Sequence, residues 1–277
     1  MFIDVHVHLG RLLRDDPGLR PADLLRWMDR HEVEQALVLP IENPEETYFY
    51  VTTEQVIRWC RPHRDRLLPY ANIDPRRGTR RAGDFGQILG DYAERGCVGF
   101  GEMLAVLPIN DGRLKQIYEV CGELGWPVML HIGSYGGIDR PGLPLLDEIC
   151  REFPRTRFIG HAQYFWSEIS GRVNRRTRGG YPAGPVAPGG RLDILLGRHG
   201  NLYADISARS GYNALARDRQ FARGFLERHA RQVLFGSDYL RRGQSTPQFQ
   251  LLSGLDLRPG VKRAIARDNA RRLFGLG

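Results

Sequence analysis

The sequence predicts an α/β protein with the architecture of a (β/α)8 TIM barrel. Short, nearly continuous apolar stretches of strand length alternate with amphipathic stretches of helix length along the chain, a pattern typical of a parallel sheet covered on both faces. Eight such pairs favour a closed barrel over an open sheet. The GxGxxG motif that would indicate a dinucleotide-binding fold follows none of the predicted strands.

The boundaries of the elements are set by recognisable residues. Pro21 begins the first helix, because proline suits the first helical turn, and Leu24 and Met28 then share one face. Pro75 ends the third strand, because the residue before a proline is restricted. The predicted strands are 2–8, 36–40, 67–73, 97–102, 127–131, 157–161, 202–206 and 233–238, and the predicted helices begin at Pro21 and then cover 53–60, 85–95, 114–124, 143–153, 192–198, 221–229 and 261–273.

The composition is that of a globular protein with a large core. The 277 residues are 42% hydrophobic and 26% charged, and no apolar run is long enough to cross a membrane. We find no internal repeat or linker and expect one domain over 1–277, with a long loop inserted at about 163–190 after the sixth strand. The first strand begins without the segments of a secretory signal, so we expect a cytoplasmic protein.

The formal net charge of +8 raises the question of nucleic-acid or anionic partners. The basic residues are spread along the chain, nearly all are arginines, and no RNA-binding or helix-turn-helix pattern accompanies them. We therefore expect a small-molecule substrate, which an anionic molecule would fit, and neither a nucleic-acid nor a membrane partner. A homo-oligomer stays open.

The most informative motif is the His6-Val7-His8 stretch of the first strand. Successive side chains of a strand point to opposite faces, so the two histidines share a face, with Asp4 one step behind them. Two imidazoles at the end of a buried strand can chelate a divalent metal. Two hydrogen-bonded histidines without a metal would give the same motif, so the rest of the chain must decide.

Polar side chains also end several later strands. Such groups, placed directly after Val, Leu, Ile or Phe, are costly to bury unless they have partners. The carboxyl ends of barrel strands meet at one rim, where the active sites of these barrels lie. The candidate metal ligands at this rim are His6, His8, Glu102, His131, His161 and Asp238.

The types of these residues indicate the kind of site. Imidazoles and carboxylates suit Zn²⁺, Mn²⁺ or Fe²⁺, and we expect Zn²⁺ first, as one or two ions. A structural zinc site would more often use cysteines. Each residue alone has an ordinary explanation, since Glu102 could pair with an arginine and Asp238 could cap a helix. Their convergence favours one catalytic metal centre.

On these residues the chain resembles the amidohydrolase superfamily of metal-dependent barrels over its whole length. Its local sequence is most similar to the amidohydrolase-related branch, which includes the aminocarboxymuconate-semialdehyde decarboxylase-like enzymes. The resemblance implies a metallo-dependent hydrolase type of barrel. The segments that carry it are Ile3-Asp4-Val5-His6-Val7-His8, Gly160-His161-Ala162, Asn201-Leu202-Tyr203-Ala204-Asp205 and Leu234-Phe235-Gly236-Ser237-Asp238.

Glu102 distinguishes between members of this superfamily. Many of its hydrolases carry a carboxylated lysine on strand four that bridges two metals, and TatD-like members use a glutamate there. The decarboxylases typically bind one metal and have no ligand on this strand. Glu102 therefore favours hydrolysis and permits a two-metal site.

The mechanism that the resemblance implies is metal-assisted hydrolysis. His6, His8 and Asp238 would hold the first metal, and Glu102 would join or bridge to a second one held by His131 and His161. The metal would activate water and polarise a carbonyl of an amide, ester or lactone. Asp238 would act as the base and later as the proton donor, and in a one-metal version His161 would face and polarise the substrate.

Substrate recognition should come from loops that follow the strands. Arg209, in the turn after the seventh strand, is the best candidate for binding a carboxylate, and Trp166 is a second candidate for substrate binding. The loop at 163–190 is rich in arginine and aromatic residues and would serve as a lid. A solvated surface loop or a subunit contact would explain its composition equally well.

Four alternatives to a metal-dependent hydrolase of a small molecule stay open. The first is a non-oxidative, metal-dependent decarboxylase of an aromatic or enoic acid, and a lesser one is a TatD-like nuclease. A metal-independent lactonase and a catalytically silent barrel with a structural metal complete the set. The sequence leaves the substrate, the metal number and the oligomeric state undecided.

Overall fold

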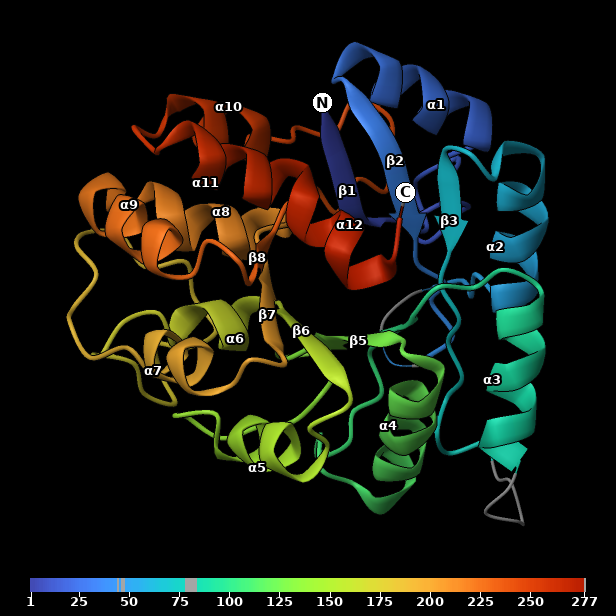
Figure 1. The fold of residues 1–277 in the computed structure, drawn as a ribbon, viewed down its shortest axis with the longest axis horizontal. Helices are drawn as coiled ribbons and strands as arrows, with labels where there is room; N and C mark the ends of the chain where they lie inside the picture. The colour runs from blue at the N-terminus through green and yellow to red at the C-terminus, as the bar shows by residue number, and fades with distance from the viewer. Residues whose placement is uncertain (44, 46–47, 78–83, 277) are drawn as a thin grey trace.

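The structure, a computed structural model, describes residues 1–43, 45, 48–77 and 84–276. Parallel strands form its centre and helices surround them (Figure 1). This arrangement confirms the predicted (β/α)8 barrel. The strands are β1 (Phe2–Val7), β2 (Val33–Val38), β3 (Leu67–Pro69), β4 (Phe100–Met103), β5 (Pro127–His131), β6 (Arg157–His161), β7 (Leu202–Asp205) and β8 (Val233–Leu234).

The strands form two sheets, β1-β2-β3 and β4-β5-β6-β7-β8, which meet at both seams. At one seam Ala71, just after β3, makes a parallel bridge with Phe100 of β4. At the other, Val7 of β1 makes a parallel bridge with Tyr239, and the Val5 amide donates to the Phe235 carbonyl over 3.0 Å. Neighbouring strands are therefore joined all the way around, and their carboxyl ends share one rim.

The helices begin and end at residues with clear local reasons. Thr52 caps α2 in a capping box with Gln55, and Gly125 ends α4 with a φ of 69°. The helices are α1 (Pro21–Arg30), α2 (Thr53–Cys60), η1 (Arg61–His63), α3 (Asp84–Glu94), α4 (Gly112–Leu124), α5 (Pro144–Glu152), α6 (Gln163–Ser167), α7 (Arg191–Arg198), α8 (Ala208–Ala216), α9 (Arg219–Arg228), α10 (Gln248–Gly254), α11 (Pro259–Arg263), the π-helical η2 (Ala264–Asp268) and α12 (Asn269–Phe274).

The sequence-based boundaries differ from the structure mainly near the rim. The predicted strand 233–238 is regular only over β8, because the amides of Ser237 and Asp238 bond to the Asp4 carboxylate and the His6 carbonyl instead of to β7. The helices α8 and α10 were not predicted, and the predicted helix 261–273 is divided into α11, η2 and α12. The long loop at 163–190 begins with the short α6 and has no further helix or strand.

The barrel interior is filled by a buried apolar cluster to which several strands contribute. It includes Ile3, Leu37, Met129, Ile159 and Leu234 from five different strands, each without exposed surface. Ala270 and Leu273 of α12 belong to the same cluster, so this helix packs against its end. The packed interior leaves the carboxyl ends of the strands as the place for polar side chains.

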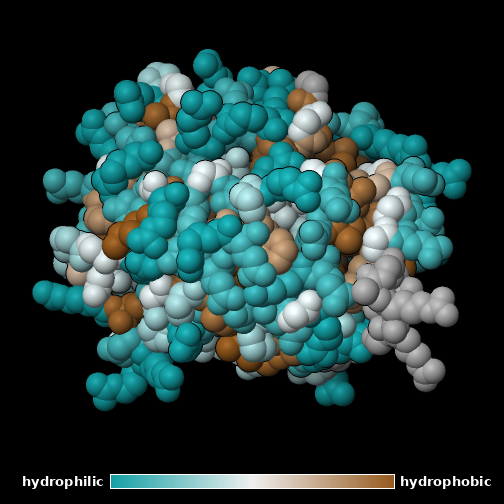
Figure 2. Space-filling model, turned by 60° about the horizontal axis from the view of Figure 1, so that its bottom comes forward, coloured by the Kyte–Doolittle hydropathy of each residue, from teal (hydrophilic) through white to brown (hydrophobic). Residues whose placement is uncertain are grey.

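Hydrophilic residues cover most of the face drawn in Figure 2, where hydrophobic residues reach the surface only in small separate groups. Within the described residues, none of the helices is both long and apolar enough to span a membrane.

Candidate metal centre

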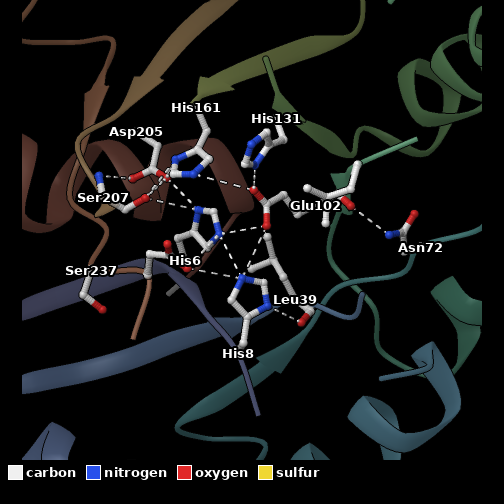
Figure 3. A network of polar contacts seen from close by, with 12 residues as sticks. His6, His8, Leu39, Asn72, Glu102, His131, His161, Asp205, Ser207 and Ser237 are labelled. Carbon is white, nitrogen blue, oxygen red and sulfur yellow. Dashed lines mark hydrogen bonds and ion pairs between the residues drawn. The ribbon is translucent and has the colours of Figure 1, made fainter. Parts of the chain in front are cut away.

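The six side chains that the sequence predicts as metal ligands gather at the rim of the barrel, and Figure 3 labels all of them except Asp238. His6 lies in β1 and His8 directly after it, Glu102 lies in β4, and Asp238 follows β8. The amide of Asp238 donates to the carbonyl of His6 over 2.8 Å, which holds the aspartate beside the first strand. His131 and His161 are the last residues of β5 and β6 and pair across the sheet.

Four of these side chains converge on one point. The Nε2 atoms of His6 and His8 lie 3.1 Å apart, and each lies 3.4 Å from Oε2 of Glu102. Oδ1 of Asp238 lies 3.7 Å from Nε2 of His6 and 3.4 Å from Nε2 of His8. Nδ1 of His8 faces the Leu39 carbonyl at 2.9 Å, which orients its Nε2 toward this point.

Glu102 connects this group to the other two histidines. Its Oε1 atom lies 2.6 Å from Nδ1 of His131 and 3.6 Å from Nε2 of His161. One carboxylate therefore faces two pairs of imidazoles, one pair with each oxygen. The Asn72 amide group donates to the Glu102 carbonyl over 2.8 Å and supports the backbone at this position.

Sequence reasoning missed two residues of the site, Asp205 at the end of β7 and Ser207 just after it. Neither has exposed surface. Asp205 Oδ2 lies 2.7 Å from Nδ1 of His6, and Ser207 Oγ lies 3.0 Å from Nδ1 of His161. The signal was present, because Asp205 is also a carboxylate at the end of an apolar strand, like the other rim residues.

The charges of the site shift several pKa values strongly. Burial alone would raise the pKa of Glu102, but the charge of His6 and that of His131 lower it well below its usual range. Burial lowers the pKa of His6, but the Glu102 charge and the Asp205 hydrogen bond outweigh it and the pKa is raised. Burial raises the pKa of Asp4 to about 7 despite hydrogen bonds from Ser237 and the His6 backbone.

The backbone around the rim adopts conformations that non-glycine residues rarely take. Ala162 after β6, Ala208 after β7 and Asp238 after β8 have φ angles of 80°, 55° and 57°. Left-handed backbone at such residues costs free energy and is concentrated at functional sites. Here it occurs directly beside His161, Ser207 and the carboxylate of Asp238.

The two predicted substrate-binding residues lie in different environments. Arg209 in α8 is exposed, and its guanidinium lies 4.4 Å from the centre of the Tyr181 ring in the 163–190 loop. Trp166 is only 1% exposed, and its indole N–H donates to the Asp205 carbonyl over 2.8 Å. Its ring thus supports the rim from within, and Trp166 is not part of the proposed substrate site.

The chemistry of this donor set fits a divalent metal. Two groups of side chains have one donor atom each within 4.8 Å of one another, His6 with His8 and Asp238, and His6 with Glu102 and His161. Two imidazole nitrogens only 3.1 Å apart cannot both be protonated without repulsion. A cation between them and the carboxylates would replace these protons.

A comparison with protein families identifies the family of the chain. A family model described as Amidohydrolase matches residues 3–276. The chain therefore belongs to the amidohydrolase family and is an enzyme of the amidohydrolase superfamily. No curated protein sequence matches the chain.

Several solved structures share the fold at low sequence identity. A probable 2-pyrone-4,6-dicarboxylic acid hydrolase from Acinetobacter baumannii, with citric acid bound, is 15% identical with a TM-score of 0.67, and 99% of each chain is covered. A 2,6-dihydroxybenzoate decarboxylase from Rhizobium is 15% identical with a TM-score of 0.61, and again 99% of each chain is covered. A 5-carboxyvanillate decarboxylase from Novosphingobium aromaticivorans, complexed with manganese and a nitrobenzoic acid, is 14% identical with a TM-score of 0.60, covering 91% of this chain and 79% of that one.

Proposed function

We propose that the protein is a metal-dependent hydrolase that uses activated water on a small-molecule amide, ester or lactone. The observation that carries this proposal is the position of Glu102. Its two oxygens face two different pairs of imidazoles, the first pair at 3.4 Å and the second at 2.6 and 3.6 Å. A carboxylate between two sets of ligands suits a bridging role, which favours hydrolysis over the one-metal chemistry of a decarboxylase.

The ligands in this proposal divide into two sets. His6, His8 and Asp238 would hold one divalent cation, and His131 and His161 would take part in holding a second, with Glu102 between them. Zn²⁺ suits this mixture of imidazoles and carboxylates, and Mn²⁺ or Fe²⁺ would also fit. When bound, such a cation supplies Lewis acidity that activates water and polarises a carbonyl.

Asp238 is the residue that we assign to proton transfer. Its side chain is 20% exposed, whereas that of Glu102 is 6% exposed and that of His8 is 3% exposed. Asp238 is therefore the carboxylate of the set that water and a substrate can best reach. Its carboxylate would accept a proton from the attacking water and later return it to the leaving group.

We propose Arg209 as the residue that binds an anionic group of the substrate. Its guanidinium is exposed and rests on the Tyr181 ring, which holds it without neutralising its charge. An arginine in this state can bind a carboxylate with two parallel hydrogen bonds. The substrate would then be a small anionic molecule, and we expect the reaction to take place in the cytoplasm.

A non-oxidative decarboxylase of an aromatic or enoic acid is the second candidate. It is favoured by the structures of similar fold, which include decarboxylases of 2,6-dihydroxybenzoate and 5-carboxyvanillate. The same rim residues would then hold one metal, and His161 would face the substrate.

One screen distinguishes these two functions. The protein is loaded with Zn²⁺ or Mn²⁺ and incubated with a panel of amides, esters and lactones, from which the release of carboxylic acid is measured. It is incubated separately with aromatic and enoic acids, from which the release of carbon dioxide is measured. The proposal expects hydrolysis that is lost in Asp238→Asn. Carbon dioxide release without any hydrolysis would contradict it and support the decarboxylase.

A further inference from the structure

Two residues behind the metal centre contact two of its histidines at once. Oδ2 of Asp205 lies 2.7 Å from Nδ1 of His6 and 3.2 Å from Nδ1 of His161. Oγ of Ser207 lies 3.2 Å and 3.0 Å from the same two nitrogens. A histidine of β1 and a histidine of β6 therefore share one carboxylate and one hydroxyl, all of them buried (Figure 3).

The hydrogen-bonding capacities of these groups determine the direction of each bond. The Ser207 hydroxyl lies 2.5 Å from Asp205 Oδ2 and donates its proton to it. An ionised carboxylate can only accept, and the Ser207 oxygen has only its lone pairs left for the rings. Both imidazoles must therefore carry hydrogen on Nδ1, since each Nδ1 faces acceptors only.

This assignment determines what the opposite side of each ring offers. A neutral imidazole with hydrogen on Nδ1 has its lone pair on Nε2. Nε2 of His6 faces Nε2 of His8 at 3.1 Å, and Nε2 of His161 faces Glu102 Oε1 at 3.6 Å. The lone pairs of both histidines are thus directed at the candidate metal centre.

The backbone just after β8 leaves room for this arrangement. A Cβ atom at Gly236 would lie 2.2 Å from Oδ1 of Asp205 and 3.0 Å from Cβ of Ser207. Any larger residue at this position would displace the carboxylate. The close approach of the chain after β8 therefore requires glycine and confines Asp205 at Oδ1, the oxygen that the two histidines do not contact.

We propose that Asp205 and Ser207 act as one positioning unit, which holds both His6 and His161 as Nδ1–H tautomers with their Nε2 atoms aimed at the metal. The proposal rests on the metal centre of the proposed function and does not depend on which reaction that centre catalyses. Partners of this kind typically change metal affinity about 10- to 100-fold when they are removed.

Ser207 provides the sharper test, because it can be changed without removing a charge. The chains to compare are the unmodified protein, Ser207→Ala, Ser207→Thr, Asp205→Asn and the control Asp193→Asn, which alters a histidine–carboxylate pair outside the rim. The Zn²⁺ dissociation constant is measured by competition with a chromogenic chelator. The ring N–H protons of His6 and His161 are recorded by ¹H NMR with and without Zn²⁺ and assigned with His6→Gln and His161→Gln.

The proposal expects Zn²⁺ binding about 10- to 100-fold weaker in Ser207→Ala and Asp205→Asn, and near-normal binding in Ser207→Thr and Asp193→Asn. In Ser207→Ala the Nδ1 proton of His161 keeps only Asp205 at 3.2 Å as its acceptor and should exchange faster with water, while that of His6, 2.7 Å from Asp205, stays protected. The proposal would be overturned if Ser207→Ala kept both its Zn²⁺ affinity and the protection of both ring protons unchanged. It would also be overturned if the unmodified protein bound no Zn²⁺. If Asp205→Asn does not fold, the two Ser207 variants decide.

Neither readout uses a substrate. A chain that binds Zn²⁺ as expected but hydrolyses nothing would therefore contradict the proposed function and leave the role of Asp205 and Ser207 standing.

Discussion

Buried histidines contact carboxylates in two regions of this molecule, at the rim and on the surrounding helices, and the two regions differ in what else the carboxylates bind. On the helices, His199 lies 2.6 Å from Asp147 and His229 lies 2.6 Å from Asp193. Asp147 also pairs with Arg191 and Arg198, and Asp193 with Arg228. These carboxylates have permanent cations beside them.

At the rim the carboxylates pair with imidazoles instead of arginines. Within the part of the chain that the structure describes, Glu102, Asp205 and Asp238 form no ion pair with an arginine or lysine. Their contacts are as short as those on the helices, with 2.6 Å from Glu102 to His131 and 2.7 Å from Asp205 to His6. Three buried or half-buried carboxylates without a permanent cation would be stabilised by a bound cation, which a metal would supply.

The largest expected effect comes from removing a rim carboxylate. Asp238→Asn should lower kcat/KM about 10²- to 10⁴-fold, because an amide cannot accept the proton of the attacking water. The check is steady-state kinetics on the best substrate of the screen, with Asp193→Asn as the matched control. Equal losses in both variants would mean that the rim carboxylate is no different from those on the helices.

The second prediction concerns pH and the metal-free chain. Burial lowers the pKa of His8, but hydrogen bonds to Asp238 and Glu102 outweigh it and raise the pKa to about 9. A histidine with a raised pKa in the folded state stabilises the fold fully below its unfolded pKa, and this contribution is lost as the pH rises through the folded value. The free energy of unfolding without metal should therefore fall between about pH 6.5 and 9, by up to about 3 kcal/mol.

Bound metal should reverse this trend. Metal ligands must be deprotonated, so metal affinity, and with it the added stability, increases with pH. Urea unfolding at several pH values, with Zn²⁺ and with a chelator, measures both curves. Parallel curves would show that the rim histidines do not exchange protons for metal.

A third prediction concerns Arg209, the exposed arginine near the rim. Arg209→Ala should raise KM about 10-fold or more for a substrate with a carboxylate, because a charge-assisted hydrogen bond contributes about 1.5–3 kcal/mol, and should change kcat little. Kinetics on a charged substrate and on its neutral ester measure this difference. An equal increase in KM for both substrates would argue against a carboxylate contact.

The smallest effect is expected on the helices themselves. Asp193→Asn should lower the free energy of unfolding by about 1 kcal/mol, the usual net contribution of one hydrogen bond, since the Asp193 side chain is still 28% exposed. Metal content should stay unchanged. Chemical denaturation and metal analysis of the same samples test this, and a loss of metal would show that the two regions are coupled.

The sequence was sufficient to predict the barrel and the six candidate ligands, because each lies in or just after an apolar strand whose position in the chain is clear. It could not predict Asp205 and Ser207 as partners, since that requires knowing that β7 places them behind His6 and His161. Pairing of Asp205 with a histidine 199 residues away leaves no local pattern.

Trp166 illustrates a second limit of the sequence. An aromatic residue in a long loop suggests a surface for ligands, but this one lies in the short α6 and turns its ring into the core.

The short length of β8 is a further feature that the sequence could not predict. Side-chain and backbone acceptors of β1 take the amides of Ser237 and Asp238, and no local pattern reveals such a competition.

The central claim is that Glu102 joins two metal-binding groups at the rim. Its most direct test is the metal content per chain after purification without chelator and reconstitution with Zn²⁺ or Mn²⁺, for the unmodified protein and for Glu102→Ala. We expect two equivalents in the unmodified protein and the loss of at least one in the variant. A single equivalent that does not change in Glu102→Ala, or no bound metal even after reconstitution, would contradict this account.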